Sequence, residues 1–313
     1  RTEELEFAIE SEFLDIFSLQ MIYAKSTTTD QFLFVRLLPI AGGFNGQRQN
    51  AGAVESNTFE ATLGANLFKN KDFTWDATLT FTRTRQTITD LPIAPYQSGS
   101  DNLFYIRQGE TYGSIYGYTW VTSLDQMAQQ LPEGRTIADY EVNSDGFVVR
   151  AGSQGTTAEA PIRLKDPANG LDAFVKIGDG NPDFYMGFAN TFRYKGFTAY
   201  FLFDIKQGGD VYNRKSQWLT RDNRNGIMDM AGVPDGQKKA FDYYQGLYDV
   251  NSNNSYWVED ASYIKLRELS LGYSFSANEM SSLFGSDVVK GANLRVIGRN
   301  LFTISDYSGY DPE

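Results

Sequence analysis

Residues 59–82 read FEATLGANLFKNKDFTWDATLTFT, and this stretch decides the fold because it contains two runs of alternating residues. In the runs 59–67 and 73–82, apolar residues occupy every second position, and the positions between them hold mainly Thr, Glu, Asn and Asp. A period of two is typical of a β-strand with one apolar face. The polar residues 69–72 separate the runs, so we expect a tight turn and a long β-hairpin.

Three further hairpins follow from the same alternation. They pair residues 3–12 with 15–25, 183–194 with 197–206, and 261–276 with 291–303. The second of these turns at Lys195-Gly196, where we expect the glycine to supply a positive φ. The sequence therefore predicts an all-β protein built from long antiparallel strands.

The connections between these strands are either very short or very long. The turns near 13–15, 69–72 and 195–196 are short, whereas the polar segments 25–52, 122–182 and 207–258 are long. Bacterial outer-membrane β-barrels have short periplasmic turns and long extracellular loops. The runs also exceed the ~9–11 residues that a tilted strand needs to cross a bilayer. Strands of a β-sandwich, the alternative fold, average about five or six residues.

The two faces of the predicted strands support a transmembrane antiparallel β-barrel. Aromatic residues near strand ends are typical of membrane interfaces. They are Tyr23, Phe73, Trp75, Tyr194, Phe197, Tyr263, Tyr273 and Phe275. The polar face is expected to line the barrel interior, and it comprises Glu60, Thr62, Asn66, Thr74, Asp76, Thr78, Thr80 and Thr82. In the sandwich alternative, the aromatic residues would lie at the edge of an apolar core.

Composition excludes several classes of function. The 313 residues include no Cys and no His, so disulfides, cysteine nucleophiles, Cys/His zinc sites and histidine acid–base catalysis are excluded. The net charge of −11 argues against nucleic acid as a partner, because phosphate binding needs clustered Lys and Arg. No apolar run approaches the roughly 20 residues of a membrane helix.

Counting crossings predicts ten strands in residues 1–313. If the short turns are periplasmic, an even number of crossings must lie between residues 88 and 182. We expect the segments 102–108 and 113–122 to supply two. Ten strands that finish on the loop side need one more strand to return. The chain is therefore predicted to be a piece of a larger barrel and not a barrel that closes on itself.

Several motifs resemble those of a known family. Residues 260–273 read DASYIKLRELSLGY, and residues 299–303 and 307–313 read RNLFT and YSGYDPE. Weaker glycine motifs occur at 108–118 and 180–188. In this order the motifs resemble the SusC/RagA-like TonB-dependent transporters of Bacteroidetes outer membranes.

The resemblance implies that the chain is the C-terminal part of a twenty-two-stranded barrel, with the last strand missing and the plug domain outside this chain. It implies a transporter and no enzyme or cofactor, with import of an oligosaccharide or, alternatively, of peptides. Its expected partners are a SusD-like surface lipoprotein, the TonB-ExbB-ExbD complex through a region outside this chain, outer-membrane lipid, and a second transporter–lipoprotein pair in a dimer. A surface glycan-binding all-β protein is the alternative from another class.

Aromatic residues in the segment 207–258 are candidates for contact with a ligand or a partner. They are Tyr212, Trp218, Tyr243, Tyr244, Tyr256 and Trp257. Aromatic faces stack on sugar rings or anchor partner proteins. The alternative is that these rings pack the loop against its neighbours. Tyr248 and the basic residues Arg214, Arg221 and Arg224 belong to the same segment.

Acidic segments outside this loop carry weaker signals. Residues 141–146 (EVNSDG) begin like a calcium loop but have Gly152 where a bidentate Glu is required, so a turn is expected and no metal site is predicted. Asp179 and Asp183 lie beside glycines and predict a turn into the next strand. No catalytic residues are assigned.

Overall fold

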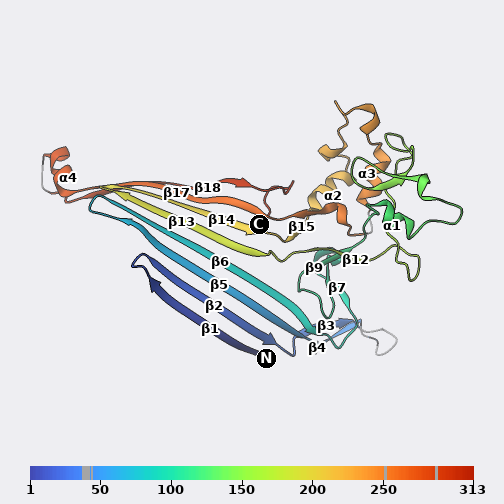
Figure 1. The fold of residues 1–313 in the computed structure, drawn as a ribbon, viewed down its shortest axis with the longest axis horizontal. Helices are drawn as coiled ribbons and strands as arrows, with labels where there is room; N and C mark the ends of the chain where they lie inside the picture. The colour runs from blue at the N-terminus through green and yellow to red at the C-terminus, as the bar shows by residue number, and fades with distance from the viewer. Residues whose placement is uncertain (37–42, 44, 250–251, 286–287) are drawn as a thin grey trace.

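A computed structural model describes residues 1–36, 43, 45–249, 252–285 and 288–313. The molecule is elongated, with a long twisted β-sheet at one end and an assembly of loops, short helices and small sheets at the other (Figure 1). This second part is called the loop assembly below, and it comprises residues 91–183 and 208–262 as far as they are described.

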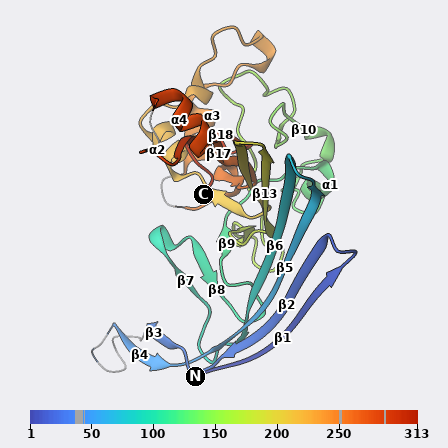
Figure 2. The same cartoon turned by 90° about the vertical axis from the view of Figure 1, so that its left-hand side faces the viewer.

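The main sheet contains eight antiparallel strands that are neighbours in chain order. They are β1 (Thr2–Phe13), β2 (Phe17–Thr28), β5 (Ala53–Lys69), β6 (Phe73–Asp90), β13 (Phe184–Tyr194), β14 (Phe197–Gln207), β17 (Tyr263–Phe275) and β18 (Ala292–Ile304). Seen from the end, the strands follow an arc, as the wall of a barrel does (Figure 2). The all-β barrel-wall fold predicted from the alternation is confirmed.

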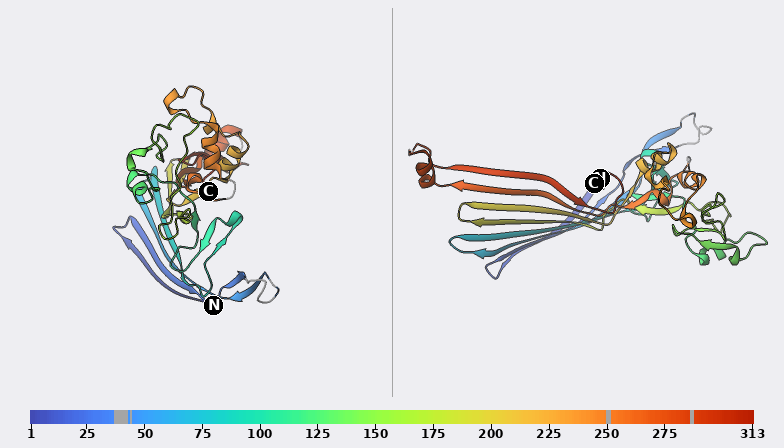
Figure 3. Two further views of the ribbon diagram at one scale, coloured as in Figure 1. Left: turned by 90° about the vertical axis from the view of Figure 1, so that its right-hand side faces the viewer. Right: turned by 90° about the horizontal axis from the view of Figure 1, so that it is seen from above.

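The two ends of the sheet differ as the connection lengths predicted. The three short turns and helix α4 (Ala277–Phe284) lie at one end, and the loop assembly lies at the other (Figures 1 and 3). Part of the predicted loop 25–52 forms a hairpin of β3 (Phe32–Arg36) and β4 (Gly46–Asn50). The remainder of that loop includes residues 37–42 and 44, which lie outside the described part of the chain.

The predicted strand count of ten is wrong for the part of the chain that the structure describes. Segments 102–108 and 113–122 contribute only β8 (Phe104–Ile106) and β9 (Ser114–Gly117). These pair within a separate sheet with β7 (Tyr96–Ser98) and β12 (Val175–Asp179). Such strands are far shorter than the ~9–11 residues needed to cross a bilayer. None of the described strands between β6 and β13 therefore crosses the membrane. Zero crossings still satisfy the expectation that their number is even.

The strand faces separate apolar from polar residues. Phe73, Trp75 and Phe192 lie on one face, where the Trp75 and Phe192 rings stack with centroids 5.4 Å apart. On the opposite face Arg193 Nη1 lies 2.6 Å from Asp76 Oδ2 across the β6–β13 pair. The apolar face is called the outer face below, because a barrel wall presents its apolar face to lipid.

Tyr263 does not share the outer face with the other strand-end aromatics, contrary to the prediction. A β-bulge shifts the register of β17 between Leu266 and Glu268. A one-residue shift sends the following side chains to the opposite face. Tyr263 and Tyr273 therefore point to opposite sides, and the buried Tyr263 hydroxyl donates to Asp204 Oδ2 at 3.3 Å on the inner face.

The turn at residues 195–196 also differs in detail from the prediction. The positive φ of 52° belongs to Lys195 and not to Gly196. Gly196 is required for space, since a Cβ there would lie 2.7 Å from Cε2 of Tyr273 and 2.9 Å from the carbonyl oxygen of Ser274. Contact this close cannot be accommodated without a shift of the neighbouring strand.

The loop assembly contains the remaining regular elements. Its helices are α1 (Leu124–Ala128), α2 (Arg214–Arg221) and α3 (Phe241–Tyr248). Its short strands are completed by β10 (Tyr140–Val142), β11 (Val148–Arg150), β15 (Asp210–Tyr212) and β16 (Val258–Asp260). Single 3₁₀ turns occur at Ser100–Asn102, Ile137–Asp139, Gly226–Met228, Asp235–Gln237 and Ser255–Trp257. None of the described helices is long and apolar enough to span a membrane.

The loop assembly has apolar cores of its own. One cluster contains Trp120, Tyr243, Tyr244 and Leu247, and another is built on Val121, Met127, Tyr140 and Val148. A third joins Ile115, Tyr212 and Trp257. The first and third clusters combine residues from distant segments, so burial of apolar surface fixes these loops relative to one another, whereas the second packs within one segment.

Candidate functional site

Five of the six predicted contact aromatics pack inside the loop assembly. Tyr212, Tyr243, Tyr244 and Trp257 are buried, and Tyr256 packs partly buried against the Trp120 cluster. Burial raises the pKa of Tyr212 to about 12 and raises the pKa values of Tyr243 and Tyr256 still further. These positions support the packing alternative.

Trp218 is the exception, because 49% of its surface is exposed. It lies on α2 and lines a cavity of about 660 Å³, together with Arg214, Arg221 and Tyr248 from the same predicted segment. Other segments supply the rest of the lining: Gln97, Asp101, Asn102, Tyr118, Phe174, Ser252 and Asn253. Arg224 is not among the lining residues. This cavity is called the Trp218 cavity below.

Helix α2 is positioned by its N-cap. The Asn213 side-chain oxygen accepts a hydrogen bond from the Ser216 amide at 2.9 Å, which satisfies a helix-terminal donor. The side-chain nitrogen of Asn213, Nδ2, donates to Glu259 Oε1 at 2.7 Å and to Ser308 Oγ at 2.9 Å. One buried asparagine thus fixes the start of the helix against β16 and the region after β18.

The two arginines of the Trp218 cavity are held in different ways. Arg214 donates to Gln217 Oε1 at 2.7 Å and to Asn253 Oδ1 at 2.5 Å, and its guanidinium stacks 4.5 Å from the Tyr212 ring centroid. Arg221 is more exposed, and its Nε lies 2.7 Å from Asp222 Oδ1. The cavity therefore offers one fixed and one solvent-exposed guanidinium.

The cavity combines three kinds of binding group. Trp218, Tyr118 and Phe174 offer aromatic surfaces, Gln97 and Asn102 offer amides, and the arginines and Asp101 offer charges. Aromatic surface with a few convergent polar groups is the usual character of a small-ligand site. Tyr118 and Phe174 were missed from the sequence, because only tertiary contacts bring them to α2.

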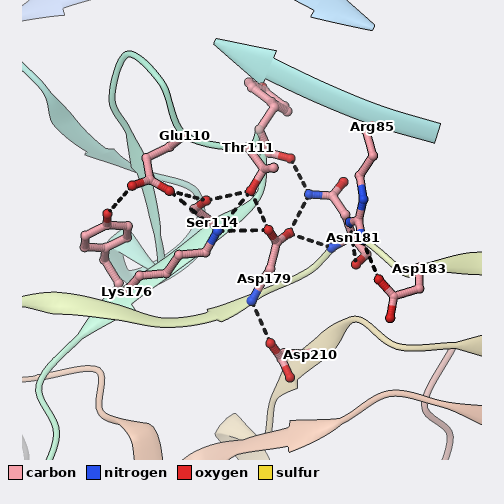
Figure 4. A network of polar contacts seen from close by, with 11 residues as sticks. Arg85, Glu110, Thr111, Ser114, Lys176, Asp179, Asn181, Asp183 and Asp210 are labelled. Atoms are coloured by element: carbon pink, nitrogen blue, oxygen red, sulfur yellow. Dashed lines mark hydrogen bonds and ion pairs between the residues drawn. The ribbon is translucent and has the colours of Figure 1, made fainter. Parts of the chain in front are cut away.

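A polar network joins the main sheet to the loop assembly (Figure 4). Asp179 on β12 accepts hydrogen bonds from Thr111, from Lys176 Nζ at 3.0 Å and from Asn181 Nδ2 at 2.6 Å. The Asp179 amide donates to Asp210 Oδ2 at 2.7 Å. The predicted turn leading from Asp179 into β13 is therefore present, and it is held at both ends.

Opposite pKa shifts accompany this network. Burial raises the pKa of Asp179, but the hydrogen bonds from Thr111, Asn181 and Lys176 outweigh it, so the net pKa is lowered. Burial also raises the pKa of Asp210, and there it prevails over the single hydrogen bond from the Asp179 amide. Asp179 is thus held ionised as a structural acceptor.

The network also reaches the end of β6. Arg85 Nη2 lies 2.5 Å from Asp183 Oδ1, and its Nη1 donates to the Asn181 carbonyl at 3.4 Å. A second opening of about 400 Å³ lies beside these residues. The polar side chains of the network bind one another, so the network holds the loop assembly against the end of the main sheet.

The segment 141–146 comprises the end of β10 and the hairpin turn that leads to β11. The Asn143 side-chain oxygen accepts from the amides of Asp145 at 3.0 Å and Phe147 at 2.9 Å. This is the geometry of an Asx turn. Within the described residues, no group of three or more His, Cys, Asp or Glu could hold a metal ion.

No family model matches the chain. It is 29% identical over 296 residues to the TonB-dependent receptor P3 of Formosa agariphila, a match that covers 91% of this chain and 28% of that protein. It is 25% identical over 305 residues to the TonB-dependent receptor SusC of Bacteroides thetaiotaomicron, covering 91% of this chain and 27% of SusC. The chain thus spans less than a third of the length of these relatives.

The fold matches solved structures over almost the whole chain. Against the RagAB peptide importer in its closed-closed state the TM-score is 0.66 at 21% identity, covering 99% of this chain and 32% of that chain. The relatives and this structure are named as receptors and transporters, not as enzymes. The chain is therefore similar in sequence to TonB-dependent receptors, SusC among them, and it has the fold of part of a SusC/RagA-like β-barrel wall of the bacterial outer membrane.

Proposed function

We propose that the protein containing this chain imports an oligosaccharide across the outer membrane, driven by TonB. The similarity to SusC and other TonB-dependent receptors supports import. The observation that favours a sugar is the Trp218 cavity, where an exposed indole lies beside amide and guanidinium groups. A flat apolar ring can stack on the face of a sugar, and the polar groups can hydrogen-bond its hydroxyls.

The loop assembly is also the place where a surface partner would bind. We propose that a SusD-like lipoprotein contacts this end, that the TonB-ExbB-ExbD complex acts through parts of the protein outside this chain, and that two transporter–lipoprotein pairs form a dimer. The long loops lie at one end of the wall, which in outer-membrane barrels is the extracellular end. Support for the lipoprotein comes from the similarity to SusC and to the RagAB structure.

Import of peptides is the second candidate. It is favoured by the similarity of the fold to the RagAB peptide importer and by the charged groups of the cavity. Arg221 could pair with a peptide carboxylate and Asp101 with an amino terminus, because both side chains are partly exposed. Indole stacking would then contribute less than the charges.

Binding measurements on a Trp218→Ala variant test the proposal. The solubilised protein is titrated calorimetrically with a panel of oligosaccharides and a panel of peptides. We expect a bound oligosaccharide whose affinity falls about tenfold or more in the variant, corresponding to about 1.4 kcal/mol. Phe241→Ala is the matched control, since Phe241 is 53% exposed in the same assembly but does not line the cavity. Binding of peptides alone would contradict the oligosaccharide assignment.

A further inference from the structure

Helix α4 presents an unusual apolar surface at the turn end of the main sheet (Figure 1). Leu283 is 65% exposed and Phe284 is 66% exposed. Together with Ala277 and Met280 they follow three- and four-residue spacing, so they share one side of the helix. Asn278 and Ser282 belong to the other side.

This helix is well defined by its ends. Ser276 and Glu279 form a capping box, with the Glu279 carboxylate accepting from the Ser276 amide at 2.7 Å. Gly285 ends the helix in the left-handed conformation with φ 64°. Met280 is buried, whereas Ala277, Leu283 and Phe284 are exposed, and the last two are the large residues of the exposed apolar side. Their exposure therefore belongs to a capped helix and not to a frayed turn.

A side-chain contact fixes α4 on the outer face of the sheet. The Tyr273 hydroxyl donates to the Glu279 carboxylate. Tyr273 lies in the outer-face row, with its ring centroid 4.5 Å from that of Phe197 and 4.7 Å from that of Phe275. Leu294 of β18 is its cross-strand neighbour. The helix thus continues the apolar outer face just beyond the last aromatic row.

We propose that α4 lies in the interface of the periplasmic lipid leaflet, with Leu283 and Phe284 among the acyl chains. The short-turn end of an outer-membrane barrel is periplasmic. Capped amphipathic helices with Leu and Phe on one side bind in this plane of a bilayer. The occupant is phospholipid and not a protein, because Glu279 joins the helix to Tyr273 of the lipid-facing row at the turn end of the sheet.

Spin labelling of the reconstituted protein tests this inference. The 313 residues contain no Cys, so Phe284→Cys introduces one labelling site in this chain. In proteoliposomes of phosphatidylethanolamine and phosphatidylglycerol, we expect a nitroxide at position 284 to collide severalfold more with oxygen than with a water-soluble nickel chelate. Ser282→Cys, on the polar side, should show the reverse ratio. Leu271→Cys, 58% exposed on the outer face, provides the lipid reference.

Two outcomes would overturn the proposal. Equal access of the nickel chelate at positions 284 and 282 would place the apolar side in water. Low access of both reagents at position 284 would show that protein covers it. Leu283→Cys is measured in parallel, so that a local defect at one position does not decide the result. Heat-modifiable migration in electrophoresis checks that each labelled barrel is folded.

Discussion

Lys239 Nζ lies 2.5 Å from Glu159 Oε1, and both side chains are almost completely buried, at 4% and 0% exposure. Glu159 also accepts from Asn143 Nδ2 at 2.9 Å and from the Gly155 amide at 2.9 Å. The Lys239 ammonium lies 4.8 Å from the Tyr243 ring centroid. A buried ion pair thus connects the two long segments of the loop assembly and fixes the surroundings of Tyr243.

Replacing one member of this pair should loosen the loop assembly. Lys239→Met leaves a buried, uncompensated carboxylate, and breaking a buried pair in this way costs about 3–5 kcal/mol. Hydrogen exchange of residues 141–159 measures the loss. The double variant Lys239→Met/Glu159→Leu removes both charges and should recover much of the protection. Unchanged exchange in Lys239→Met would show that the pair does not stabilise the assembly.

The same pair predicts a dependence of loop stability on pH. Burial raises the pKa of Glu159, but hydrogen bonds from Lys239, Gly155 and Asn143 outweigh it, and the net pKa is lowered. A carboxyl with a lowered folded pKa contributes stability that is present above its unfolded value of about 4.3 and lost as pH falls through the folded value. Brief exposure to acid should therefore loosen the wild-type loop assembly as the pH falls below the unfolded value of about 4.3. Limited proteolysis after each acid pulse measures this loosening. A Glu159→Gln variant should lack this component, and an identical acid profile in the two proteins would exclude Glu159 as its source.

Adjacent residues of β6 should differ in how well they tolerate an introduced charge. Leu79 belongs to the outer face and Thr78 to the inner face. An arginine on the lipid face near the bilayer midplane costs roughly 2–4 kcal/mol in a membrane barrel. Leu79→Arg should therefore lower the folded fraction in refolding titrations into lipid, whereas Thr78→Arg should change it little. Equal effects of the two substitutions would contradict the assignment of faces.

A charge cluster holds the residues after β18 against the inner face. Buried Lys265 lies 2.6 Å from Asp311 Oδ1 and 2.9 Å from Glu313 Oε2. Hydrogen bonds from Arg267 and then Lys265 lower the pKa of Glu313 to about 2. Lys265→Met should make residues 307–313 exchange faster by more than tenfold. The matched control is Arg299→Ala, because Arg299 is exposed and its ion pair with Glu268 is expected to contribute at most about 1 kcal/mol. Similar exchange in both variants would argue against the cluster.

The local sequence pattern predicts the strands of the main sheet but not the contacts within the loop assembly, and the reason is physical. The alternation in 59–82 is a property of each strand by itself, so β5 and β6 were predicted without knowledge of their partners. The face of Tyr263 depended on a bulge that the sequence pattern does not reveal. In the same way, the sequence placed Trp218 among the candidates, but only the fold distinguishes it from buried Tyr243 and brings Phe174 to its cavity.

Uptake by living cells tests the central proposal most directly. Labelled oligosaccharides and peptides are offered to cells with and without the gene, and with the proton gradient intact or dissipated. We predict that oligosaccharide accumulation is lost on deletion and on dissipation, and that the Trp218→Ala gene restores it less well than the wild-type gene. Undiminished oligosaccharide accumulation in the deletion strain, with loss of peptide uptake instead, would contradict the proposal.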